Sequence, residues 1–158
     1  MKKPLIVCAL ALTLFAGIMR PSYGILDKTR FVAHLGIAYF AFHHWVWKPY
    51  KAGSFATGAP HRTKDIIKGG VALLFAVHEV KVADDIAHKS SSPLLHKLVA
   101  PLDNLSAGFS NLGTNLKGGH FNPQDVEQMN TNVNGFNAQS TAAGAAIKDV
   151  PVAIPGAG

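Results

Sequence analysis

The segment Phe31–Trp47 constrains the fold most, because its 17 residues are apolar or aromatic on nearly every side apart from a few histidines. A helix that is apolar all round is buried within a protein. A strand is the competing interpretation, but 17 residues is long for a strand. Asp27 is placed to cap a helix start, and Pro49 to end it. The sequence therefore predicts a buried central helix over residues 28–48.

Three more helices are predicted from apolar residues that recur at three- and four-residue spacing, over residues 63–89, 93–117 and 123–147. Pro101 should kink or divide the second of these. Asn122 supplies an N-cap before the last. Connections of mostly a few residues favour an up-down arrangement. The predicted fold class is all-α, a small bundle of about four helices in one domain over residues 25–149.

Gly69 and Gly70 interrupt the helix predicted over residues 63–89. Glycine inside a helix costs about 1 kcal/mol relative to alanine. Small side chains at these positions let a second helix approach closely. We expect that neighbour to be the helix over residues 28–48, which offers its own small residues, namely Ala33, Gly36 and Ala41.

Two segments outside the helices also matter. The loop over residues 49–62 is long enough to be functional or mobile. Residues 150–158 alternate small and branched residues with two prolines. The sequence predicts that they form an extended, loosely held C-terminal tail.

The first 24 residues have the order of a secretory signal peptide. A basic start precedes the apolar run Leu5–Met19, then Pro21 and a small-residue site ending at Gly24. The run is shorter than the about 20 residues that span a membrane. We therefore expect a leader over residues 1–24 that is cleaved after Gly24, and a protein that is secreted or associated with the cell envelope. Cleavage after Ala16 and an uncleaved anchor are the alternatives.

Removing the leader changes what chemistry remains. The single cysteine, Cys8, leaves with it, so the exported chain has no disulfide, thiol nucleophile or thiolate metal ligand. The formal net charge falls from +6 to +3, because Lys2, Lys3 and Arg20 are lost. That charge is too small for the concentrated basic stripe of a nucleic-acid-binding protein, so no nucleic-acid partner is expected.

Histidine is unusually clustered, with seven of the eight residues between His34 and His96. Asp84 and His88 are four residues apart, so one helix face can present both to a metal ion. Asp85 is the alternative carboxylate, and a third ligand would come from the helix over residues 28–48 or from His61. A transition-metal site is therefore one hypothesis for these residues: His43, His44, Asp84 and His88. A pH sensor built from the same histidines is another.

The end of the aromatic helix combines Trp45, Trp47 and Tyr50 with Lys48 and Lys51. Tryptophan and tyrosine favour a membrane–water boundary, and lysine stems extend beside them. The same residues would also suit a core that opens to solvent at one end. The sequence predicts a partner or membrane contact at these five residues.

No catalytic motif appears in the chain: there is no Gly-x-Ser-x-Gly elbow, no His-Glu-x-x-His pair and no phosphate-binding glycine loop. We therefore expect an exported, non-enzymatic helical protein that acts by binding to another protein or to a membrane surface. One alternative is a small metal- or ligand-binding helical protein. A second is a membrane-active helical factor.

Overall fold

The computed structural model of the chain describes residues 22–158, so the leader expected over residues 1–24 lies almost entirely outside the described residues. Within them the protein is all-helical and has no strand, which confirms the predicted fold class. Four long helices form the bundle: α1 (Ser22–Phe42), α3 (Arg62–Lys89), α5 (Val99–Lys117) and α6 (Pro123–Ala142). The short elements are a π-helical turn, η1 (His43–Trp47), and two single turns, α2 (Lys48–Lys51) and α4 (Pro93–His96).

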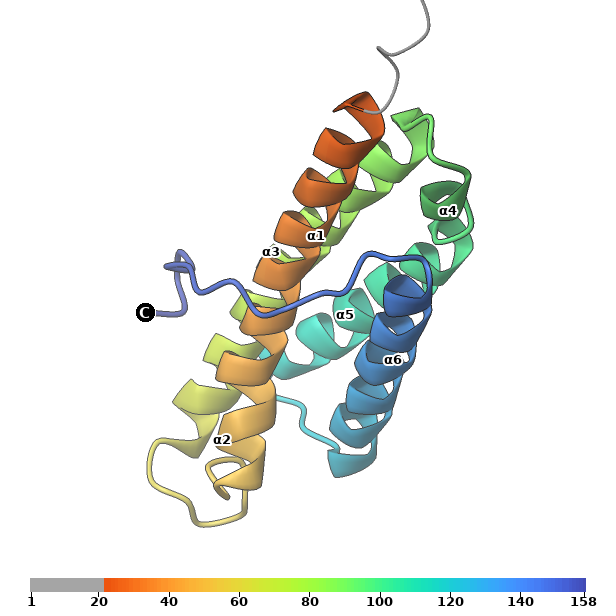
Figure 1. Cartoon of the computed structure of the whole chain (residues 1–158). Helices are drawn as coiled ribbons and strands as arrows, with labels where there is room; N and C mark the ends of the chain where they lie inside the picture. The colour runs from red at the N-terminus through yellow and green to blue at the C-terminus, as the bar shows by residue number, and fades with distance from the viewer. Residues whose placement is uncertain (1–21) are drawn as a thin grey trace, which may run out of the picture.

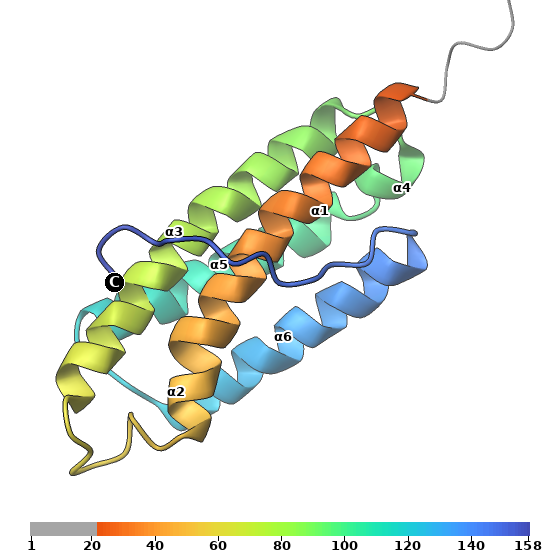
Figure 2. The same cartoon turned by 60° about the vertical axis from the view of Figure 1, so that its left-hand side comes forward.

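The four long helices run up and down, as the short connections predict (Figure 1). Helices α1 and α3 form a long antiparallel pair, and α5 packs along α3. Helix α6 returns beside α5 and completes the bundle (Figure 2). Side chains from all four long helices meet in one core.

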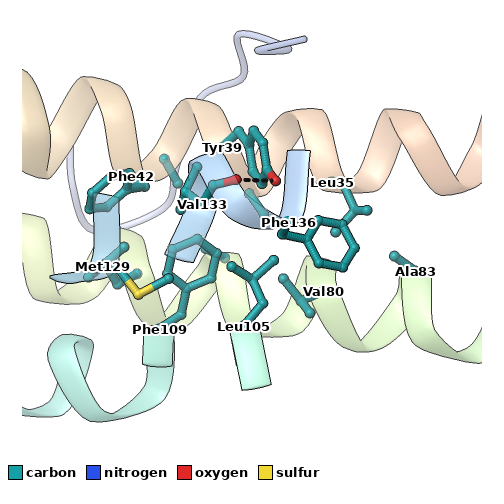
Figure 3. Close-up of a cluster of buried hydrophobic side chains, with 14 of the residues drawn as sticks. Leu35, Tyr39, Phe42, Val80, Ala83, Leu105, Phe109, Met129, Val133 and Phe136 are labelled. Carbon is teal, nitrogen blue, oxygen red and sulfur yellow. Dashed lines mark hydrogen bonds between the residues drawn. The ribbon is translucent and has the colours of Figure 1, made fainter. Parts of the chain in front are cut away.

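The centre of this core joins α1 to α6 directly (Figure 3). The Tyr39 hydroxyl donates a hydrogen bond to the carbonyl oxygen of Val133 at 3.0 Å. Burial raises the pKa of Tyr39, with a further contribution from the negative charge of Asp149, so this hydroxyl stays protonated and remains a donor. Phe109 and Phe136 pack below it and are almost fully buried. Burying a side chain of this size stabilises the fold by about 1.5–3 kcal/mol.

The central helix is longer than predicted and does not end at Pro49. It begins at Ser22, passes through the π-helical turn η1, and ends at Lys51. A π turn shifts the register of the backbone hydrogen bonds by one residue. As a result Pro49 lies in the first turn of α2, where a missing N–H group is tolerated.

Pro101 likewise does not divide its helix. The break falls earlier, after α4, and Pro101 occupies the first turn of α5. Leu95 and Leu98 are buried on either side of the break, so the change of direction keeps the apolar face on the core.

Of the two glycines, Gly69 meets the segment over residues 28–48 that was expected, whereas Gly70 meets another helix. A Cβ on Gly70 would overlap the backbone of Lys117 and lie 2.8 Å from the carbonyl oxygen of Gly113. Both belong to α5, so the close approach is between α3 and α5 and not with α1. Gly69 instead faces η1, where a Cβ would lie 2.9 Å from the carbonyl oxygen of Trp45.

The C-terminal segment is extended as predicted, but it packs on the bundle instead of standing free (Figure 2). The Val150 N–H group donates to the carbonyl oxygen of Gly36 on α1 at 2.9 Å. Gly36 lacks a side chain that would block this crossing. Ile154 and Ala157 are buried farther along. The apolar residues of this segment therefore hold it against the bundle. The sequence did not show which surface they would pack on.

Candidate functional site

The structure separates the residues of the predicted metal site. The Nδ1 atom of His43 lies 2.9 Å from both carboxylate oxygens of Asp149, at the start of the C-terminal segment. His88 and Asp84 lie 3.5 Å apart on α3. Within residues 22–158, no group of three or more histidine, cysteine or carboxylate side chains is arranged to hold a metal ion.

The reason for this separation is the antiparallel packing of α1 and α3. The end of α1 lies beside Gly69, near the start of α3, because Gly69 faces Trp45. Asp84 comes 15 residues later, which is about 22 Å along a helix that rises 1.5 Å per residue. His43 and Asp84 therefore belong to opposite halves of the bundle. Sequence spacing alone could not show this, because it does not fix which ends of two helices meet.

His34 is partly exposed and contacts a carboxylate of the neighbouring helix. Its Nδ1 lies 2.7 Å from the Glu79 carboxylate on α3. Glu79 is 7% exposed, which makes it one of the few buried charged residues in the described part of the chain. The pair joins α1 to α3 near the middle of the bundle.

The predicted contact residues form a packed aromatic cluster. Trp47 stacks on Phe42 with a centroid distance of 6.4 Å and on Tyr50 at 5.8 Å. Tyr50 in turn contacts Phe121, which packs edge-on against Phe55 at 5.2 Å. The tryptophan and tyrosine side chains are partly buried against the core. They therefore contribute to the core and also keep part of each ring at the surface.

Lysine ammonium groups lie above these rings. The Lys51 Nζ is 5.3 Å from the centre of the Trp47 ring and 5.9 Å from that of Tyr50. The Lys68 Nζ is 5.8 Å from the Trp45 ring. Such cation–π contacts contribute about 0.5–1 kcal/mol at exposed sites. Of the predicted residues, the structure thus places Lys51 against Trp47 and Tyr50, whereas Trp45 is paired with Lys68, which was not predicted.

A small hollow of about 230 Å³ opens beside Trp45, where η1, the following loop and α3 meet. Its polar lining comes from His44, Ser54, Asp65 and Lys68. His44 is exposed and stacks on Phe40 at 4.9 Å, so its ring faces solvent and not a metal partner.

We call this half of the bundle the aromatic end and define it by residues 43–68 and 116–128. Six basic residues lie in it, against three acidic ones. The basic residues are Lys48, Lys51, Arg62, Lys64, Lys68 and Lys117, and the acidic ones are Asp65, Asp125 and Glu127. The Glu127 carboxylate raises the pKa of Tyr50, together with slight desolvation of the phenol.

The opposite half, the aliphatic end, is defined by residues 22–30 and 84–104. It has four basic and four acidic residues, so its formal charge is balanced. It exposes three large aliphatic side chains: Ile25 at 63%, Leu26 at 59% and Leu94 at 43%. The remaining charges of residues 22–158 also cancel, so the net +3 of the described chain lies at the aromatic end.

The Asp84 carboxyl at the aliphatic end has an altered pKa. Partial burial raises it, the charges of Asp103 and Asp85 raise it further, and His88 opposes them. One oxygen of this carboxylate is buried without a hydrogen-bond partner in the described structure. This arrangement penalises the charged form and does not create a metal ligand.

The fold and the two ends define an all-α bundle with a basic aromatic pole. Among its helices in residues 22–158, none has the length and apolarity that crossing a membrane requires. Comparison with protein families, curated proteins and solved structures gives no match for this chain.

Proposed function

We propose that this chain is an exported, non-enzymatic helical protein that acts by binding at the cell envelope, and that its aromatic end contacts an anionic membrane surface. The observation that carries the proposal is the position of the net charge. All of the +3 of residues 22–158 lies at the end that also presents Trp45, Trp47 and Tyr50. Tryptophan and tyrosine beside lysine is the composition of a membrane-interface contact.

The magnitude of the attraction follows from the exposed cations. Lys48, Lys51, Lys64 and Lys117 are exposed at this end. Each basic residue near an anionic lipid surface contributes about 1 kcal/mol, so four give about 4 kcal/mol. That corresponds to a dissociation constant of about 1 mM from charge alone. The rings must add to this for tight binding, and the charge-driven part must weaken as salt rises.

Flotation of the exported protein with phosphatidylglycerol vesicles tests the proposal. A triple variant, Lys48→Gln, Lys51→Gln and Lys64→Gln, should bind about a hundredfold more weakly, because about 3 kcal/mol of attraction is removed. The matched control removes three exposed cations from the aliphatic end with Arg30→Gln, Lys89→Gln and Lys97→Gln. It should bind nearly as the wild type does.

Two results would contradict the proposal. One is equal loss of binding in both triple variants, which would show that only the total charge matters. The other is binding that resists high salt and ignores both sets of substitutions, which is the behaviour of the membrane-active alternative or of a retained leader. Intact mass distinguishes those two, because residues 1–24 account for about 2.5 kDa of the 16.8 kDa chain.

The metal-binding alternative has less support. Among the described residues the four proposed ligands occupy opposite halves of the bundle. Elemental analysis of protein purified without an affinity tag remains its direct test. A stoichiometric transition metal would restore that hypothesis.

A further inference from the structure

A groove between α5 and α6 extends from residues of the aliphatic end to residues of the aromatic end. Its larger hollow has a volume of about 660 Å³, and no charged side chain lines it. The floor is apolar and consists mainly of Leu105 and Phe136, both nearly fully buried. The walls carry the side-chain amides of Asn104 on α5 and of Asn132 and Gln139 on α6.

The amides continue into a second hollow of about 230 Å³, to which Asn132 also contributes and which has one charged lining residue, Asp125. On α5 the amide positions are separated by seven and then four residues, and on α6 by four and then seven. The two sets are Asn104, Asn111 and Asn115 on α5, and Gln128, Asn132 and Gln139 on α6. Because the helices are antiparallel, these sets face each other at intervals of about 6 and 10.5 Å.

Most of these amides are free to bind a ligand. Gln128 donates to Asn132 across one turn of α6 at 3.0 Å. Within residues 22–158 the side chains of Asn104, Asn111 and Gln139 make no hydrogen bond to the protein. Each side-chain amide carries both donors and an acceptor. The groove therefore offers donors and acceptors on both walls.

Gly135 keeps the larger hollow open. It lines the hollow, and a Cβ placed on it would meet no atom within 4 Å. Glycine in the middle of a helix is unfavourable relative to alanine. Neither a close helix contact nor a left-handed backbone accounts for it at this position. The missing side chain at Gly135 leaves space between the amides of α5 and those of α6.

We propose that this groove binds an extended, uncharged stretch of polypeptide, with the wall amides pairing its backbone N–H and C=O groups. An extended chain presents equivalent groups every two residues, or about 6.6–6.8 Å, close to the shorter amide interval. The amides of α5 span about 16 Å, which is the length of about five extended residues. A sugar is less suited, because Phe136 is only 4% exposed and offers no open ring face for stacking.

Selection of a phage-displayed library of random twelve-residue peptides against the exported protein tests this proposal. Enriched peptides should bind Gly135→Leu at least about tenfold more weakly, because the new side chain fills the hollow between the amides. Leucine is a better helix former than glycine, so the variant should fold at least as well as the wild type. Asn134→Leu places the same side chain about 100° around α6, outside the groove, and should bind the peptides as the wild type does.

The double variant Asn104→Leu and Gln139→Leu gives a second readout, since it keeps the hollow open and removes the pairing groups. It should also lose binding. Failure to enrich any peptide, or peptides that bind wild type and Gly135→Leu equally, would overturn the proposal. Binding of a neutral oligosaccharide that Gly135→Leu abolishes, with no peptide enriched, would assign the groove to a sugar instead. None of these results depends on membrane contact at the aromatic end.

Discussion

Net charge and exposed apolar surface, the two properties that drive binding to a surface, lie at opposite ends of the bundle. The aromatic end has the net positive charge and rings that are half-buried beneath lysine ammonium groups. The aliphatic end has balanced charge and exposes Ile25, Leu26 and Leu94. A charged contact weakens with salt, whereas an apolar contact does not. Salt and apolar substitutions should therefore affect the two ends differently, so each end can be tested separately.

The largest expected effect is the cost of losing a buried apolar side chain of the aromatic end, compared with an exposed one of the aliphatic end. Phe55 is 1% exposed and holds the loop of the aromatic end in place, where its carbonyl oxygen accepts a hydrogen bond from Arg62 Nε at 2.9 Å. Phe55→Ala should lower the free energy of unfolding by about 3 kcal/mol or more. Leu94→Ala at the aliphatic end should change it by less than about 0.5 kcal/mol. Urea denaturation measures both, and equal effects would contradict the assigned burial.

A smaller effect is expected from filling space between helices. Gly70→Ala should destabilise the protein by about 1–3 kcal/mol, because the added methyl group forces α3 and α5 apart. Gly135→Ala, in the middle of α6, meets no atom within 4 Å and should be neutral or slightly stabilising. Thermal unfolding of the two variants compares them directly. A stable Gly70→Ala protein would show that the helices do not approach closely there.

The exposed aliphatic side chains should matter for association but not for stability. The variant Leu26→Ser with Leu94→Ser should keep the unfolding free energy within about 0.5 kcal/mol and bind less of a hydrophobic dye. Ile67→Ser is a matched control, since Ile67 is 37% exposed but lies at the aromatic end. Vesicle binding should be unchanged in the double variant. If it is lost instead, the aliphatic end is the membrane contact.

The smallest effect concerns the pH dependence at the aliphatic end. The raised pKa of Asp84 means that the folded state takes up a proton more readily than the unfolded state. Stability therefore falls as pH rises from the ordinary aspartate value, about 3.9, through the raised one. Asp84→Asn should be more stable than the wild type at pH 7 by less than about 0.5 kcal/mol, because solvent screens this side chain. The difference in unfolding free energy between Asp84→Asn and the wild type should vanish near pH 4. A larger difference near pH 4 than at pH 7 would show that the pKa of Asp84 is not raised in the folded state.

The secondary structure was predictable to the extent that local patterns determine it. Apolar periodicity and the caps at Asn122 and Pro123 placed the helices, and the Asn122 side chain does accept a hydrogen bond from the Gln124 N–H group at 3.1 Å. The same local patterns did not show that Pro49 would be accommodated by a π turn. That outcome depends on how the end of α1 packs on α3 and on the loop.

Contacts between helices that are distant in the chain were harder to predict from the sequence. The sequence grouped His43 with Asp84, although antiparallel packing places them in opposite halves of the bundle. It also assigned Gly70 to the helix over residues 28–48, whereas the structure packs it against α5. Trp47, Tyr50 and Lys51 are neighbours in the fold because they are close in the chain, and their role as a contact surface stays a prediction. The amide groove had a sequence signal, the matching four- and seven-residue intervals on two helices, but its meaning depends on those helices being neighbours.

Tryptophan fluorescence tests the central claim most directly, because both tryptophans of the chain, Trp45 and Trp47, lie at the aromatic end. The measurement is tryptophan emission of the protein with phosphatidylglycerol vesicles that carry bromine on the upper part of the acyl chains. Our account predicts a blue shift and quenching that disappear at high salt. Vesicle binding without any change in the emission would show that another part of the molecule contacts the membrane and would contradict the account.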